Sequence, residues 1–407
     1  MTHRRPILGL AALAALSTLA GCGGPLPRSD AADGGTAPLA SAGPGLPAGA
    51  ATPEQVMLGR ELVINRDCGA CHGGNVNPAS DRWLAGASGE DDFGNIGPFR
   101  YWAANLTPDP ETGTGRYSAR QIFNALRYGL RPGATPDVEI TSMVPGQGNH
   151  PAAPNYLSPA MPWMAWRFMS DQELWAIAAY LKHGVRPVHN QVRRSESPPD
   201  FWASEVTPAK IGTHVMPPFP TAAEEMRAPE RAAQLMRGRE LAASAACSAC
   251  HGGGLNPSQE GWLVGMRDTT MDFQIGPFVT RPRNLTPDNA TGLGRFSERQ
   301  IFNALRYGLR PGETPDVDIT SSVPGQGNHP ANPKYLAPPM PWPAWRHMPD
   351  EDLWAIAAYL KQGVRPVRNR VQDSDGPPDF WRGEYTVEKY GAWPAPAFPT
   401  ARETYKP

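Results

Sequence analysis

Two short motifs of cysteine and histidine are the part of this chain with the clearest capacity for chemistry. Each has the form Cys-x-x-Cys-His, and together they comprise Cys68, Cys71 and His72, then Cys247, Cys250 and His251. In this spacing two thiols can add to the two vinyl groups of one haem, while the adjacent imidazole reaches the iron. The motifs therefore predict two covalently bound haem c groups with the histidines as iron ligands.

Other uses of paired cysteines fit the sequence less well. A thioredoxin-like redox pair requires a βαβ context, and a zinc ribbon requires a second Cys-x-x-Cys within about 20 residues. The two pairs lie much further apart than that, and the fifth cysteine, Cys22, has a separate predicted role. The sequence therefore favours haem attachment and leaves no cysteine for a disulfide.

The chain is a tandem duplication. The haem-attachment motif and the other motifs shared by the two halves recur 179 positions later without a gap, so residues 50–228 and 229–407 are two copies of one unit. Agreement is densest between 118–150 and 297–329, where 29 of 33 positions are identical. Duplication of this kind predicts two domains rather than one compact domain.

Residues 1–21 have the layout of an export signal peptide. A short basic start precedes an apolar run that ends in Leu-Ala-Gly directly before Cys22. This ending resembles the lipobox of bacterial lipoproteins, which implies lipidation at Cys22 and attachment to the periplasmic side of a bacterial membrane. The alternative is an ordinary signal peptide with an incidental cysteine. Residues 22–49 are almost entirely small or polar, which predicts a flexible linker.

The composition excludes one class of partner. The formal net charge is −1 and charged residues make up 19% of the chain, so no excess of basic residues is available to follow a phosphate backbone. Proline and glycine are abundant, with 47 and 42 residues, but 12 Trp, 12 Phe and 11 Tyr supply material for a core. We expect a loop-rich globular protein and no nucleic-acid partner.

Helical signals surround each motif. A capping box at 52–55 predicts a helix of about three turns that leads into the first motif. Apolar residues at i, i+3, i+4 and i+7 predict another helix at 171–182, with its copy at 350–361. A third helix is predicted to begin at Ser118 and to stop at Gly129.

In these features the sequence resembles the class I c-type cytochromes, in which an N-terminal helix leads into Cys-x-x-Cys-His and crosses a C-terminal helix. Gly59 and Gly238 stand where that family keeps a small residue so that the helices approach closely. The resemblance implies an all-α fold of two tandem class I cytochrome c-like domains with long loop insertions. It also makes the carbonyls of Pro98 and Pro277 candidates to accept the proton-bearing nitrogen of each ligating histidine.

A second axial ligand should occur in both copies. The resemblance favours Met161 and Met340, because the family places a methionine on a loop before the last helix. Two other pairs remain open, namely Met169 with Met348 and His150 with His329. The first of these would otherwise act as a hydrophobic staple at the helix start, and the second would give bis-histidine ligation.

Methionine ligation favours a carrier over an enzyme. A thioether raises the reduction potential relative to a second imidazole, and a six-coordinate iron has no open position for oxygen or peroxide. We therefore expect a non-enzymatic dihaem cytochrome that carries single electrons. The alternative is a dihaem peroxidase or oxidase, which needs one haem iron with an accessible position.

The shared Asn-Leu-Thr-Pro-Asp segments, which begin at Asn105 and Asn284, extend the resemblance. With the flanking helix they resemble the multi-haem cytochrome subunits that accept electrons from periplasmic sugar and alcohol dehydrogenases. Those subunits usually carry three haem motifs, and this chain has two. The resemblance implies redox partner proteins, such as a periplasmic dehydrogenase or a terminal oxidase.

Overall fold

The computed structural model describes residues 51–88, 94–96, 99–195, 206–266, 272–373 and 380–405. The predicted signal peptide, Cys22 and the linker lie outside the described residues. Within them, no helix combines the length and the apolar character needed to cross a membrane.

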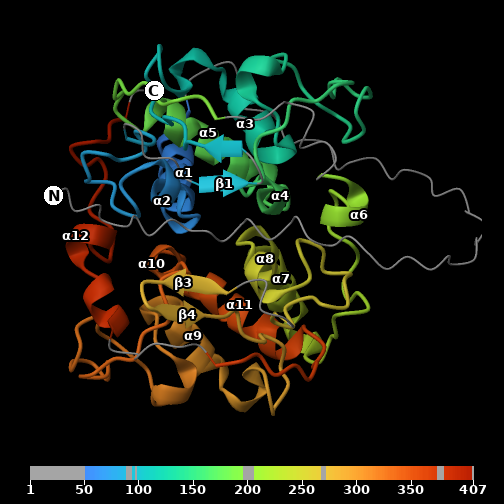
Figure 1. The fold of residues 1–407 in the computed structure, drawn as a ribbon, viewed down its shortest axis with the longest axis vertical. Coiled ribbons are helices and arrows are strands. Elements are labelled where there is room, and N and C mark those ends of the chain that lie inside the picture. Colours follow the sequence, from blue (N-terminus) through green and yellow to red (C-terminus); the bar gives the residue numbers. More distant parts are fainter. Residues whose placement is uncertain are drawn as a thin grey trace, which may run out of the picture.

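The two repeats form two halves with the same order of elements (Figure 1). The first half contains α1 (Pro53–Asn65), α2 (Cys68–His72), β1 (Gly94–Ile96), β2 (Phe99–Tyr101), α3 (Ala119–Tyr128), α4 (Trp163–Trp166), α5 (Asp171–His183) and α6 (Pro208–Ile211). The second contains α7 (Ala232–Ser244), α8 (Cys247–His251), β3 (Phe273–Ile275), β4 (Phe278–Thr280), α9 (Glu298–Tyr307), α10 (Trp342–Trp345), α11 (Asp350–Gln362) and α12 (Val387–Tyr390). Short 3-10 turns and loops connect them.

Helices dominate, but each half also has a short antiparallel hairpin that helical periodicity did not predict. β1 pairs with β2 through Gly94–Tyr101 and Ile96–Phe99, and β3 pairs with β4 in the same register. The fold is therefore mostly helical, with one two-stranded sheet in each half.

Local capping explains where the helices begin and end. The predicted capping box at α1 is present, since Gln55 N donates to Thr52 Oγ1 at 3.3 Å and Thr52 N donates to Gln55 Oε1 at 3.0 Å. The predicted box at Ser118 opens α3, and Gly129, with φ 69°, ends it. These signals are local, so they act in the same way wherever the helix packs.

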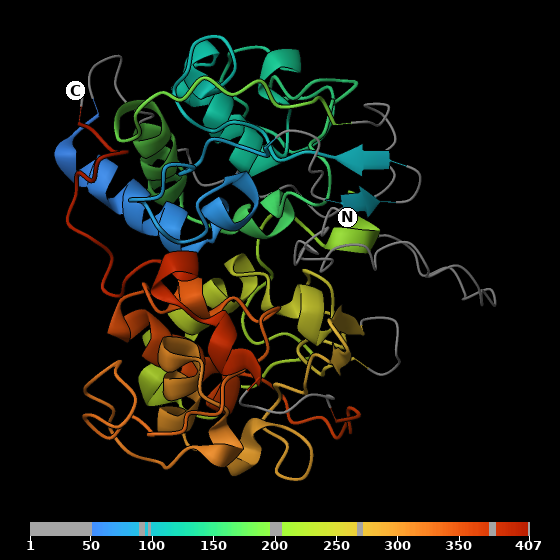
Figure 2. The same cartoon turned by 60° about the vertical axis from the view of Figure 1, so that its left-hand side comes forward.

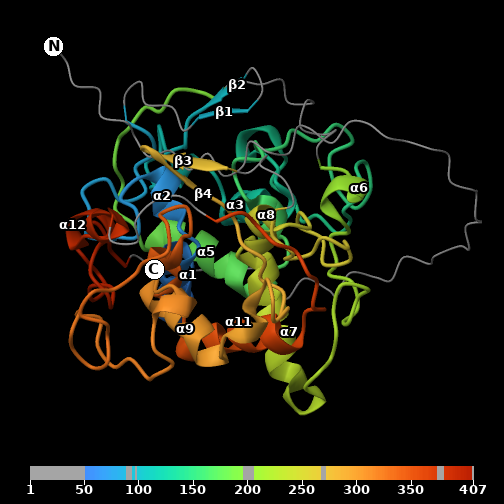
Figure 3. The same cartoon turned by 60° about the horizontal axis from the view of Figure 1, so that its bottom comes forward.

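The first and last long helices of each half cross at backbone contact. A Cβ atom built on Gly59 of α1 would lie 1.9 Å from Ala176 O of α5, and one built on Gly238 of α7 would lie 2.0 Å from Ala355 O of α11. Figure 3 shows α7 and α11 crossing in the second half, with α9 beside α11. The predicted need for glycine at both crossings is confirmed.

The ends of the two repeats are exchanged. We call residues 206–228 the first arm and residues 385–405 the second arm. Arg60 of α1 donates from Nε to Glu403 of the second arm at 2.6 Å, whereas Arg239 of α7 donates from Nε to Glu224 of the first arm at 2.7 Å. In Figure 2 the red second arm runs up from the lower half and ends beside the blue α1. Each half is therefore completed by the last segment of the other repeat.

Backbone pairing accompanies this exchange. Val185, just after α5, pairs with Glu403, and Val364, just after α11, pairs with Glu224. Each glutamate is buried and also accepts a hydrogen bond of 2.5 Å from a core tyrosine, Tyr180 for Glu403 and Tyr359 for Glu224. A buried carboxylate needs such a full set of partners to offset the loss of hydration, so the arms dock at one defined position.

Candidate haem-binding sites

Both Cys-x-x-Cys-His motifs form a single helical turn of five residues, α2 and α8. Positions i and i+3 of a helix lie on one face, so the two thiols of each motif point the same way. All four cysteines are free thiols. The residue before each turn adopts a left-handed conformation, with φ 58° at Asp67 and 57° at Ala246, which turns the chain sharply from the long helix into the motif.

A backbone carbonyl fixes the orientation of each histidine. His72 Nδ1 lies 2.6 Å from Ala104 O, and His251 Nδ1 lies 2.7 Å from Arg283 O. A carbonyl only accepts, so Nδ1 carries the hydrogen and Nε2 keeps its lone pair for a metal. Burial lowers the pKa of both histidines, which also favours the neutral, ligating form.

The predicted role of Pro277 is wrong. Gly276 and Pro277 form the exposed turn between β3 and β4. The carbonyl of Arg283, in the loop that follows β4, lies next to His251 Nδ1 instead. Pro98 lies outside the described residues. The acceptors Ala104 and Arg283 could not be found from the sequence, because any residue supplies a backbone carbonyl.

The thiols are held in their neutral form. Burial raises the pKa of Cys68 and of Cys247 to about 12, raises that of Cys250 to about 11, and raises that of Cys71 as well. Redox-active and metal-binding cysteines have lowered pKa values instead. The environment therefore disfavours a thioredoxin-like pair and fits thiols that end as thioethers.

The three candidate pairs for the distal ligand have different surroundings. Met169 and Met348 are 3% and 2% exposed within the hydrophobic core. His150 is buried, lies edge-on to Tyr128, and has Nδ1 3.2 Å from Pro151 O; His329 repeats these contacts in the second half.

Met161 and Met340 are the third pair. Each is only partly buried and borders the core, in the turn directly before α4 or α10. The side chains of Met161 and Met340 are therefore less buried than those of the two other pairs. The short helix that follows is buried through Trp163 and its copy Trp342.

The residues of each half fit a haem. The donor set is two same-facing thiols and an imidazole with a free Nε2, as covalent attachment and axial ligation require. In the first half, the buried indole nitrogen of Trp163, two residues after Met161, has no hydrogen-bond acceptor among the described residues. Such a donor is costly to leave unpaired, and a bound group with acceptor oxygens would satisfy it.

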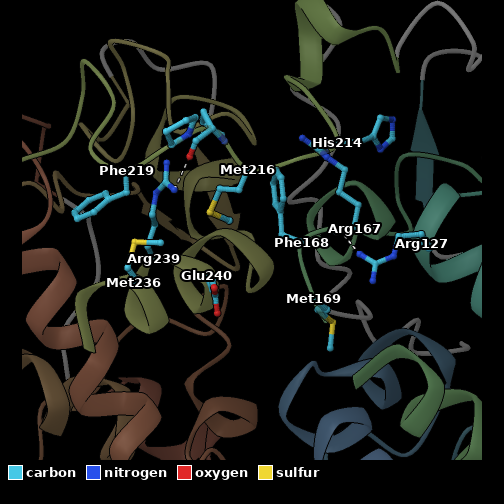
Figure 4. Close-up of a pocket in the computed structure, with 12 residues that line it drawn as sticks. Arg127, Arg167, Phe168, Met169, His214, Met216, Phe219, Met236, Arg239 and Glu240 are labelled. Carbon is cyan, nitrogen blue, oxygen red and sulfur yellow. Dashed lines mark hydrogen bonds between the residues drawn. The ribbon is translucent and has the colours of Figure 1, made fainter. Parts of the chain in front are cut away.

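A cavity of about 290 Å³ lies between the halves, and one of the candidate distal ligands, Met169, lines it (Figure 4). Its lining comes from α3, from the loop that follows α4, from the first arm, and from α7. It contains none of the cysteines or histidines of the two motifs. Arg167 and Arg239 on its opposite sides hold the first arm through backbone carbonyls, Ile211 O for Arg167 and Pro217 O for Arg239.

The Cytochrome c family model matches residues 56–184 and 235–363, so the chain belongs to the cytochrome c family. It is an electron-transfer c-type cytochrome, and its two domains carry covalently bound haem c with iron. The predictions of tandem cytochrome c domains, of covalent haem c and of an electron carrier are confirmed.

Several curated proteins are similar to this chain. It is 28% identical to the cytochrome c subunit of gluconate 2-dehydrogenase from Pantoea cypripedii, over 81% of this chain and 65% of that protein. It is 27% identical to the cytochrome c subunit of alcohol dehydrogenase (quinone) from Gluconacetobacter polyoxogenes, over 75% and 55%. It is 25% identical to the fructose dehydrogenase cytochrome subunit from Gluconobacter japonicus, over 77% and 54%. The chain thus spans about half to two thirds of the length of these relatives.

Proposed function

We propose that this protein is the electron-carrying subunit of a periplasmic dehydrogenase complex and is not itself a catalyst. The similar proteins are cytochrome subunits of gluconate, alcohol and fructose dehydrogenases. The observation that carries the proposal is that both halves present one donor set, a histidine fixed through Nδ1 and a methionine at the same place before the last helix. Two such sites suit a relay of single electrons.

Each half has its own set of haem-holding residues. Cys68 and Cys71 attach the first haem, and Cys247 and Cys250 the second. His72 and His251 are the proximal ligands through Nε2, and Met161 and Met340 are the distal ligands. When bound, each haem supplies one iron that gains or loses a single electron. The chain's part is to hold both ligands in place, so that coordination stays constant and substrates are kept from the iron.

We further propose that Cys22 is lipidated and that the linker 22–49 tethers the cytochrome domains to the periplasmic side of a membrane. The supporting observation is the Leu-Ala-Gly sequence directly before Cys22 at the end of an apolar run. Cys22→Ser should release the protein into the soluble fraction when no partner subunit is present. Membrane attachment that survives this substitution would overturn the lipid anchor.

Ligand assignment is tested by the same substitution at each methionine. Met161→Leu and Met340→Leu should each remove half of the weak near-infrared sulfur-to-iron absorption of the oxidised protein, because each removes one thioether from an iron. Met169→Leu and Met348→Leu are the matched controls and should leave the band intact, since leucine fills a buried methionine site at a cost below about 1.5 kcal/mol. A full band in Met161→Leu would overturn the assignment.

The same preparations separate a carrier from a peroxidase. Two equivalent six-coordinate sites should remain low-spin in both oxidation states, and the reduced protein should bind carbon monoxide slowly. If one haem becomes high-spin on half-reduction and peroxide is consumed quickly, the protein is a dihaem peroxidase and not a carrier.

A further inference from the structure

The two repeats differ in charge directly before their haem-binding turns. Arg66 and Asp67 precede Cys68, whereas Ala245 and Ala246 precede Cys247. The backbone is the same in both, with left-handed φ values of 58° at Asp67 and 57° at Ala246. Because the second repeat makes this turn with two alanines, the fold does not require the charged pair of the first.

Arg66 brings a positive charge to the junction of the repeats. Arg66 is 9% exposed, and its Nη2 donates to Ser244 Oγ of the second repeat at 3.2 Å. Its Nε and Nη1 have no hydrogen-bond acceptor among the described residues. Arg66 is two residues before Cys68 and Ser244 is three residues before Cys247, so this contact joins the approaches to both haem-binding turns.

The other charges near Arg66 are bound to one another. Arg237 of α7 makes two hydrogen bonds of 2.9 Å to the carboxylate of Asp352 and lies 3.5 Å from Glu173. Among the described residues, no carboxylate oxygen comes within ion-pair distance of Arg66 itself. Its charge is felt across the junction, because Arg66 acts to lower the pKa of Cys247, and it does the same to Cys68.

Asp67 acts on the first site alone. Its carboxylate raises the pKa of both Cys68 and Cys71, whereas the causes of the shifts at Cys247 and Cys250 do not include it. The first haem-binding turn therefore faces both a positive and a negative charge, and the negative charge reaches both of its thiols. Of these two charges, the second turn faces the positive one.

We propose that Arg66 and Asp67 set the reduction potential of the second haem above that of the first, so that electrons within the chain pass from the first repeat to the second. A nearby positive charge favours the ferrous state and raises the reduction potential, and a nearby negative charge favours the ferric state and lowers it. In the step, one electron leaves the ferrous site of the first repeat, which becomes ferric, and reduces the ferric site of the second. This inference rests on the haem sites proposed above.

The test is a redox titration of the full-length protein at pH 8.5, above the pKa of Asp67, which burial raises to about 7. The wild type should titrate in two one-electron steps. Arg66→Ala should lower both steps, because Arg66 acts on both turns, and Asp67→Asn should raise the lower step only. The double variant Arg66→Ala with Asp67→Ala gives the first repeat the dipeptide of the second. It should reduce the equilibrium constant for electron exchange between the sites at least tenfold, or about 59 mV for one electron.

Arg66→Lys separates charge from packing. Lysine keeps the charge, so the upper step should stay near its wild-type position while the alanine variant moves. Equal shifts of the upper step in Arg66→Lys and Arg66→Ala, or no change of spacing in the double variant, would overturn the inference. A denatured haemochrome assay that finds fewer than two haems per chain would instead overturn the proposed sites.

Discussion

The two halves of the molecule use the same network to hold their exchanged arms. In the first half Trp83 donates to Tyr180, Tyr180 donates to Glu403, and Arg60 pairs with the same carboxylate. In the second half the equivalent residues are Trp262, Tyr359, Glu224 and Arg239, and the indole-to-tyrosine distance is 2.9 Å in both. This network connects the docked arm to the tryptophan that packs against the loop after the haem-binding turn. Both copies therefore need the same four side chains to hold the arm in place.

The two halves differ at positions outside this network. The first repeat has Phe168, and the second has His347 in its place. The helix α5 begins with a Ser170–Glu173 capping box, whereas α11 follows Pro349 at its N-cap position and has no side-chain cap. Together with Arg66 and Asp67, these positions show that duplication preserved the framework and left its surroundings free to make two similar sites unequal.

The largest expected effect comes from cutting one arm's ion pair. Glu403→Gln leaves Arg60 buried without its counter-charge, which should cost about 3–5 kcal/mol. Because the second arm docks on the first half, hydrogen exchange should accelerate in α1 and α5 and not in α7 and α11. Glu224→Gln should give the reverse pattern.

A surface ion pair on the same arm supplies the control. Asp81, whose side chain is 88% exposed, pairs with Arg402, so Asp81→Asn should change stability by less than about 1 kcal/mol. Faster exchange in α7 and α11 after Glu403→Gln would contradict the exchanged arrangement.

A smaller effect should appear as the share of the acid sensitivity that His347 contributes to the second repeat, beside that of His214 in the first, whose pKa burial also lowers to about 3. Burial, with the charges of Arg346 and Arg306, lowers the pKa of His347 to about 3, while an unfolded histidine has a pKa of about 6.5. The unfolded chain therefore binds the proton more readily, and stability is lost as pH falls below about 6.5. At pH 5 this loss is about 1–2 kcal/mol.

His347→Phe places the residue of the first repeat in the second and should remove that part of the acid sensitivity. Urea unfolding at pH 7 and pH 5 measures it as the difference between the two free energies of unfolding. An equal loss in wild type and variant would show that His347 is not the source.

The smallest expected effect concerns the unequal helix starts. Ser170→Ala removes the hydrogen bond from Glu173 N to Ser170 Oγ, which is 3.2 Å long, and should cost about 1 kcal/mol. Pro349→Ala at the equivalent position of α11 has no side-chain cap to lose. If both substitutions lower the urea midpoint equally, the capping box does not distinguish the two helices.

The parts of each site that depend on neighbours along the chain could be predicted from the sequence. The spacing of Cys68, Cys71 and His72 predicted covalent haem, and the boxes at Thr52 and Ser118 predicted helix starts that the structure contains. The carbonyl that orients the histidine could not be predicted. Arg283 lies 32 residues after His251, beyond a hairpin, and no side-chain pattern indicates that the chain returns to the histidine there.

The sequence by itself determined the duplicated unit, the haem attachment turns and the need for glycine at the helix crossings, because these depend on covalent spacing and on side-chain size. Only the tertiary structure decided which half each arm completes. The two repeats offer identical docking residues, so an arm could satisfy the glutamate site of either half, and local preferences cannot choose between them. The choice follows from the path of the chain through space, which also places Arg66 of one repeat against Ser244 of the other.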